Sequence, residues 1–198
     1  MKGHIRSSIL TIWLLIFMSY LWAQNEGIFH YEIETFFPGS KVSMSVQQGM
    51  ILFNPHFSRV EQRENNRTIG IIDNKRQEGY SYLQDLSVMV IFKPLENLTI
   101  LYPGETKQIL GYNCRKGIAT GEGFTTEFYV TDEIKATCTP TALLGWVEGF
   151  VLEYKSPSVH FRPLNLALEP IDPTLFYVPA LRVTTKEEVV EMMKGRKR

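Results

Sequence analysis

Hydrophobic and polar residues alternate along most of the chain, which predicts β-strands. In the segment 27–37, Phe29, Tyr31 and Ile33 occupy one side of the chain, and mostly polar or charged residues stand between them. Alternation with a period of two places one set of side chains on each face of a strand. Comparable segments recur at spacings of roughly 8–12 residues with turn-forming residues between them, as expected for an antiparallel sheet in one domain. They are 42–53, 57–64, 67–73, 80–92, 97–105, 150–154 and 158–172.

The segment around Cys114 predicts a β-hairpin. Leu110, Tyr112 and Cys114 alternate with small or polar residues in its first arm, and Phe124 and Phe128 do so in its second arm. The sequence TGEG between the arms consists of residues that suit a turn. We therefore expect the two arms to pair as a hairpin with a single apolar face that includes Cys114.

One helix is predicted, at the end of the chain. Thr185 stands three residues before Glu188, the spacing of a capping box, and valines and methionines follow on one side. A sheet of this many strands has to curl or be covered to hide its apolar face, and one short helix covers little of it. The sequence thus predicts a mainly β protein: a single, strongly curved antiparallel sheet, or open half-barrel, with a short C-terminal helix.

Residues 1–23 have the layout of a secretory signal peptide. Lys2 and Arg6 precede an uncharged apolar run of 15 residues that ends at Ala23, and polar residues follow. A helix that spans a bilayer needs ~20 apolar residues, so cleavage near Ala23 is favoured over an uncleaved anchor. We expect residues 24–198 to fold as a single exported β-rich domain that does not span a membrane and is periplasmic or secreted.

Composition and motifs argue against several classes of function. The chain has 21 basic and 21 acidic residues, so no excess of positive charge points to nucleic acid. It has no phosphate-binding loop, dinucleotide fingerprint or nucleophile elbow, and its histidines and cysteines lack the spacing of metal ligands. We therefore expect no cofactor, no metal site and no enzymatic activity.

The two cysteines, Cys114 and Cys138, leave three interpretations open. The alternation places Cys114 among apolar residues, where burial raises a thiol pKa, as in an inert core cysteine. An oxidising compartment also permits a disulfide between Cys114 and Cys138, which would close the hairpin and the connection after it. A reactive thiol needs a neighbouring base, and the sequence indicates none beside Cys114.

Aromatic residues at inward-facing strand positions are the candidate lining of the interior. They fit either a packed aromatic core or an apolar cavity in a curved sheet that receives an acyl chain or another hydrophobic guest. The residues concerned are Phe29, Tyr31, Phe53, Tyr82, Tyr112, Phe124 and Phe128.

Two motifs resemble the GLPGLI family and related uncharacterised exported domains of Gram-negative envelopes. They are ILGYNCRKGIAT followed by EFYVTDEI, within 109–134, and LLGWVEGFVLEY, at 143–154. In the second motif Gly145 and Gly149 match glycines of the family signature, whereas Val147 and Glu148 stand where that signature has proline. Some relatives look like the lipoprotein-carrier (LolA-like) fold, an unclosed curved sheet with a helical lid. That resemblance implies a periplasmic role in binding hydrophobic guests.

The aromatic alternation and the resemblance together give the leading hypothesis. It is a non-catalytic periplasmic or envelope protein that binds a hydrophobic or lipidated guest inside a curved sheet. The alternative is a protein-interaction or envelope-assembly factor that binds an envelope protein through its sheet edges. A thiol enzyme built on Cys114 is the third hypothesis. Bound lipid, a copurifying envelope protein and a thiol that reacts readily would distinguish the three.

Overall fold

The computed structural model describes residues 25–37, 39, 42–62, 68–121, 123–139, 143, 146–177 and 180–195. The expected signal peptide and its cleavage site lie outside these residues. The strands are Gly27–Phe36 (β1), Ser43–Phe53 (β2), Phe57–Gln62 (β3), Thr68–Asp73 (β4), Glu78–Leu83 (β5), Val88–Phe92 (β6), Thr99–Leu101 (β7), Thr106–Ile109 (β8), Tyr112–Gly121 (β9), Phe124–Thr131 (β10), Phe150–Lys155 (β11), Val159–Leu168 (β12) and Arg182–Thr184 (β13). Two 3-10 turns, Gln84–Leu86 (η1) and Pro173–Phe176 (η3), and the helix Lys186–Gly195 (α2) complete the described elements.

All thirteen described strands belong to one open sheet. Its order is β13-β6-β5-β4-β3-β2-β1-β12-β11-β10-β9-β7, and β8 also pairs with β9. The predicted fold class, a mainly β protein with one unclosed sheet and a short C-terminal helix, is confirmed. One pairing departs from the antiparallel expectation, because β13 runs parallel to β6. Strand β13 comes to lie beside β6 only after the long path that follows β12 and passes through η3, and a connection of that length permits either orientation.

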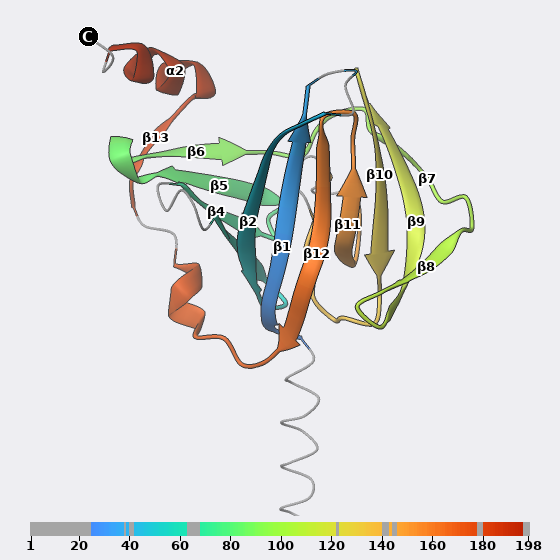
Figure 1. Cartoon of the computed structure of the whole chain (residues 1–198). Helices are drawn as coiled ribbons and strands as arrows, with labels where there is room; N and C mark the ends of the chain where they lie inside the picture. Colours follow the sequence, from blue (N-terminus) through green and yellow to red (C-terminus); the bar gives the residue numbers. More distant parts are fainter. Residues whose placement is uncertain are drawn as a thin grey trace, which may run out of the picture.

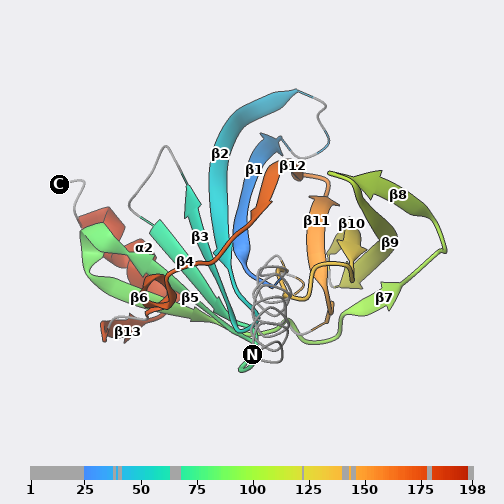
Figure 2. The ribbon, with the colours of Figure 1, turned by 90° about the horizontal axis from the view of Figure 1, so that it is seen from below.

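The sheet is bent into an arch. Figure 2 shows β1, β2 and β12 at the crown, β3 to β6 along one flank, and β11, β10 and β9 along the other. In Figure 1 the strands β4 to β6 run across the direction of β1 and β12, so the sheet twists strongly along its length. Accumulated right-handed twist between neighbouring strands produces this shape. It brings the two flanks toward a common interior.

β1 forms the crown of the arch and confirms the predicted alternation. Phe29 and Tyr31 are buried, while His30 between them and Glu32 after them are partly exposed. Tyr31 pairs with Gly49 of β2. A Cβ atom at Gly49 would lie 2.4 Å from the Tyr31 ring, so glycine is what allows the ring to lie flat against the neighbouring strand.

β9 and β10 form the predicted hairpin, but its arms do not share one apolar face. Gly121 pairs with Phe124 across a two-residue turn, and this register sets Phe128 opposite Gly117. Paired residues share a face of the sheet, and neighbours along a strand alternate. Cys114 therefore points to the face opposite to Phe128, and the prediction of a single apolar face is wrong. Turn length, rather than the alternation within each arm, fixes the register.

Helix α2 begins at the predicted cap. The backbone N–H of Glu188 donates to the Thr185 hydroxyl at 3.2 Å, as the capping-box spacing predicts. Val189 of α2 packs with Val88 and Val90 of β6. The helix thus covers the far end of one flank and leaves the crown of the arch uncovered (Figure 1).

The connection between β10 and β11 packs into the interior of the arch. Its residues Ile134, Ala136 and Cys138 are buried in one cluster with Phe29 and Phe150. The backbone N–H of Val151 donates to the Cys138 carbonyl at 2.8 Å, so the connection adds a short bridge beside β11. The interior is therefore largely filled by the chain itself.

Candidate functional site

An apolar cavity of about 200 Å³ remains between the sheet and the β10–β11 connection. Its wall is formed by side chains of β1 to β4, β11 and β12, including Tyr31, Val60, Tyr154 and Phe161, and by Cys138 and Thr139 of the connection. The cavity thus lies where the crown of the arch meets the segment that fills its interior.

Three stacked aromatic rings form one wall of this cavity. The ring centroids of Tyr31 and Phe161 are 4.7 Å apart, and those of Tyr154 and Phe161 are 5.0 Å apart. Burial raises the pKa of Tyr154 to about 12 and also raises the pKa of Tyr31. Both tyrosines are therefore neutral at physiological pH, and the wall presents no charge to a guest.

The aromatic residues named from the sequence do not line one common interior. Three clusters divide them: Phe29, Tyr31, Phe53 and the partly buried Tyr112 belong to one cluster, Phe128 and the partly buried Phe124 to a second, and Tyr82 to a third. Of these residues, only Tyr31 lines the apolar cavity. Most of the set therefore packs as core within the described part of the chain.

Apart from Cys138, named from the sequence only as a cysteine that could pair, the other residues of the cavity wall were missed by sequence reasoning. Phe161 alternates with polar neighbours in β12, so its burial could have been predicted from the pattern. Its contact with Tyr31 could not, because the pairing of β12 with β1 joins segments about 130 residues apart.

Both cysteines are free, buried thiols in the largest core cluster. Burial, with a smaller contribution from the charge of Glu133, raises the pKa of the Cys114 thiol to about 11. Burial raises the pKa of the Cys138 thiol to about 12. A thiol with such a pKa holds its proton at neutral pH and is a poor nucleophile. The possible disulfide between the two cysteines, one of the three interpretations left open by the sequence, is not formed in this structure.

A second, polar cleft lies next to the apolar cavity. It has a volume of about 530 Å³ and lies between the β4–β5 turn, β9 and the β10–β11 connection. Thr139 lines both the cleft and the apolar cavity. No sequence pattern indicates this cleft, because its residues come from four separate segments and form no motif. They are Asn74, Gln77, Tyr102, Arg115, Thr137, Thr139, Trp146, Val147 and Glu148.

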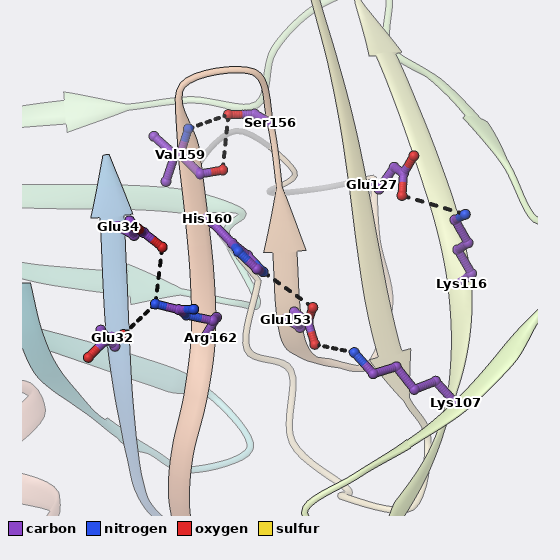
Figure 3. Close-up of polar contacts among 10 residues, drawn as sticks. All are labelled: Glu32, Glu34, Lys107, Lys116, Glu127, Glu153, Ser156, Val159, His160 and Arg162. Atoms are coloured by element: carbon purple, nitrogen blue, oxygen red, sulfur yellow. Dashed lines mark hydrogen bonds and ion pairs between the residues drawn. The ribbon is translucent and has the colours of Figure 1, made fainter. Parts of the chain in front are cut away.

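The outer face of the crown carries a network of charged side chains (Figure 3). Arg162 lies 2.7 Å from Glu32 and 3.1 Å from Glu34 on the neighbouring strand β1. Glu153 of β11 is 2.8 Å from Lys107 and 3.3 Å from His160. Each pair keeps at least one partner partly open to solvent, and its main effect is to keep this face polar. The apolar cavity is therefore on the opposite face of the crown.

Neither a metal centre nor a membrane-spanning helix is found in the described part of the chain. No three or more histidine, cysteine or acidic side chains gather there closely enough to hold a metal ion. None of the helices among the same residues is long and apolar enough to cross a membrane.

Comparison with known proteins gives one partial family match. The model of the family described as "N-glycanase peptide, N-terminal domain" matches residues 80–159, which is less than half of the chain. A search of curated proteins finds no match. The matched residues overlap the motifs that resemble the GLPGLI family, and that resemblance stays a prediction.

Two solved structures of PNGF-II align with most of this chain. PNGF-II in the C2 space group aligns with a TM-score of 0.61 and 17% identity, covering 84% of this chain and 32% of that chain. The P21 form of PNGF-II gives the same TM-score at 16% identity, covering 85% of this chain and 33% of that one. The present chain thus spans about a third of the length of PNGF-II.

Looser matches have TM-scores below 0.5. A DUF1329 family protein from Desulfovibrio piger ATCC 29098 aligns at 0.45 with 12% identity, covering 85% of this chain and 96% of that chain. MucB in complex with MucA(peri) aligns at 0.43 with 14% identity, covering 84% and 59%. These two scores support no conclusion about function. What the comparisons show is that the chain shares the fold of part of PNGF-II.

Proposed function

We propose that this protein is a non-catalytic binding domain of the cell envelope that takes an apolar group of a guest molecule into its interior cavity. The observation that carries the proposal is the cavity of about 200 Å³ walled by Tyr31, Phe161 and Tyr154. An uncharged aromatic wall favours apolar groups, because transferring their surface from water is favourable. The exported location rests on the signal-like residues 1–23.

The size of the cavity limits the guest. Benzene binds in an engineered apolar cavity of ~150 Å³, whereas typical small-molecule sites have ~300–1,000 Å³. At about 200 Å³, the present cavity accommodates one ring or a short branched chain end. A lipidated guest would therefore insert only the end of its acyl chain.

The two thiols argue against the thiol-enzyme hypothesis. Both cysteine pKa values are raised, so neither thiol is activated as a nucleophile. Thiol chemistry would need a lowered pKa, which burial opposes here.

A variant in which a larger side chain fills the cavity tests this proposal. Val60 lines the cavity and is only partly buried, so Val60→Phe adds a ring to the cavity without opening the core. We expect the chemical shifts of methyl groups around the cavity to change on titration of the parent protein with benzene and to stay unchanged in Val60→Phe. Methyl NMR measures the shifts.

Val46→Phe is the matched control for this experiment. Val46 is 48% exposed and pairs with Glu34, on the outer face of the crown. The same substitution there should leave benzene binding unaltered. The proposal fails if the parent protein shows no saturable shifts, or if Val60→Phe binds benzene as well as the parent does.

The edge-binding alternative has less support. The described strands at the edges of the sheet are short: β13 and β7 have three residues each, and β8, which also pairs with β9, has four. Short edge strands offer few unpaired backbone groups to an added strand. A copurifying envelope protein, with no effect of Val60→Phe on its binding, would favour the alternative.

A further inference from the structure

Large apolar side chains are exposed together at the end of the β1–β2 hairpin, residues 35–46. Each is between 48% and 68% exposed, and none belongs to a hydrophobic cluster in the described part of the chain. Apolar patches on the surface of a soluble protein mark sites that contact a partner or a membrane. The residues concerned are Phe37, Val42, Met44 and Val46.

Hydrogen bonds hold this end of the hairpin in place. The backbone N–H of Phe36 donates to the Ser158 carbonyl at 2.9 Å, which joins the end of β1 to the β11–β12 turn (Figure 1). The hydroxyl oxygens of Thr35 and Ser45 lie 2.8 Å apart across the pair of strands. The apolar side chains are therefore carried by paired backbone, which loses little entropy when a partner binds.

The charges around the hairpin end favour a lipid surface. Residues 35–46 contain one charged side chain, the cation Lys41. The acid that precedes them, Glu34, lies 3.1 Å from Arg162, so its charge is balanced. Glu34 also marks the start of the charged network on the outer face of the crown (Figure 3). An apolar end with one cation, followed by a charged band, matches the order of acyl chains, phosphates and water at a bilayer surface.

The size of the patch also favours a bilayer over a protein partner. A large apolar side chain has a surface on the order of 150 Å², so four that are about half exposed present roughly 300 Å². A stable protein interface buries ~800 Å² on each partner. A bilayer requires no complementary shape, and the stretch 42–46 is about 13 Å long. That length is sufficient for the depth of ~5–10 Å at which interfacial apolar faces are buried.

We propose that the end of the β1–β2 hairpin inserts into the surface of a phospholipid bilayer. The four apolar side chains enter the acyl region, the charge of Lys41 lies beside the phosphates, and the charged network of the crown stays in water. This inference does not depend on the apolar cavity. Val60→Phe should bind vesicles as the parent does, so failure of benzene binding and failure of vesicle binding are separate results.

The chain from Gln24 onward is the protein to test. Residues 25–195 contain every described strand and helix and all five hydrophobic clusters, so removal of residues 1–23 leaves the described fold complete. The removal also takes away the apolar run that ends at Ala23, which would itself bind lipid. A cooperative urea transition verifies the fold, and Trp146 is then the sole tryptophan.

Fluorescence quenching by brominated lipid locates the contact. Phe37→Trp places a second indole at the hairpin end. With vesicles of phosphatidylethanolamine and phosphatidylglycerol brominated in their acyl chains, we expect quenching and a blue shift of its emission. Tyr177→Trp, at an exposed aromatic residue outside the hairpin, is the matched control and should respond no more than the parent protein with Trp146 alone.

Sedimentation with vesicles of the same two lipids measures the affinity. The double variant Phe37→Ser with Met44→Ser should lower the partition coefficient roughly tenfold or more, because it removes apolar surface that would leave water. Leu101→Ser with Val183→Ser is the control, at two exposed apolar residues on the edge strands β7 and β13, and should bind as the parent does. All four positions are exposed, so neither double variant should lose its fold.

Three results would overturn the proposal. The first is no saturable binding of the parent protein at lipid concentrations up to about 10 mM. The second is equal quenching in Phe37→Trp and Tyr177→Trp, or equal loss of binding in the two double variants. The third is self-association of the parent without vesicle binding, abolished by Phe37→Ser with Met44→Ser, which would assign the patch to a second copy of the chain. Analytical ultracentrifugation measures the self-association.

Discussion

At the scale of single residues, burial determines what the cysteines can do. The pattern around Cys114 predicted an apolar environment and a raised thiol pKa, and the direction of that shift is confirmed. Cys138 gave no comparable signal in the sequence, since it lies in a connection without clear alternation. Only the packing of that connection against Phe150 places Cys138 in the core. The local sequence pattern was therefore sufficient to predict the burial of Cys114 but not that of Cys138.

The raised thiol pKa values predict a loss of stability at alkaline pH. Well below the ordinary thiol pKa of 9.0 both the folded and the unfolded chain hold the Cys138 proton, so the contribution of its burial is fully present. As pH rises above 9, the unfolded chain releases this proton while the folded chain keeps it up to a pKa of about 12. The free energy of unfolding should therefore fall by about 1.4 kcal/mol per pH unit for each such thiol.

Urea unfolding at pH 8, 9 and 10 measures this slope, because these values lie on both sides of the ordinary thiol pKa of 9.0. The free energy of unfolding should fall less steeply with pH in Cys138→Ala than in the parent protein. It should fall less steeply still in the double variant that also carries Cys114→Ala. Equal slopes in all three proteins would contradict the prediction, whatever their stability at neutral pH.

At the scale of elements, the turns determine strand boundaries and strand register, which alternation alone does not. The sequence pattern assigned Leu110 to a strand, but Leu110 and Gly111 form the turn between β8 and β9, with φ of 51° and 87°. Strand β8 was not predicted, because its residues show no apolar alternation. The hairpin register of β9 with β10 likewise follows from a turn of two residues. A turn that shifts the register by one residue exchanges the faces of a strand.

The β8–β9 turn gives a prediction about stability. A leucine with positive φ is strained, and a turn with positive φ at both central residues favours Asn followed by Gly. Leu110→Asn should raise the free energy of unfolding by about 1 kcal/mol. Leu110→Ala removes the same exposed side chain, but alanine does not favour positive φ. Its free energy of unfolding should therefore rise less than that of Leu110→Asn. Urea denaturation compares the two, and an equal or larger gain for alanine would contradict the strain argument.

At the scale of the whole molecule, the β10–β11 connection holds the two flanks of the arch together. The Thr137 carbonyl accepts hydrogen bonds from Asn74 Nδ2 at 2.8 Å and from Ser58 Oγ at 3.2 Å. Thr137 belongs to the connection between β10 and β11, and its two donors belong to β3 and the β4–β5 turn. These bonds join segments 63 and 79 residues apart in the sequence.

Loss of one of these bonds should loosen the connection. Asn74→Ala should lower the free energy of unfolding by about 1 kcal/mol, the net value of one hydrogen bond. It should also increase hydrogen exchange in residues 132–139 more than elsewhere in the sheet. Lys75→Ala, at the exposed neighbouring position of the same turn, is the control and should change neither quantity. If protection from hydrogen exchange were lost uniformly across the sheet, the hydrogen bond between Asn74 and Thr137 would have no local role.

The sequence by itself determined the strands of strong alternation, the capped C-terminal helix and the fold class of one open, mainly antiparallel sheet. Alternation and capping depend on neighbours within a few residues, so they can be read along the chain. The tertiary structure alone decided which faces meet, that β13 runs parallel to β6, and that the β10–β11 connection fills the interior. It also created the small apolar cavity and the polar cleft. Both spaces are bounded by residues distant in sequence, and their contacts depend on register, twist and packing, which no local pattern encodes.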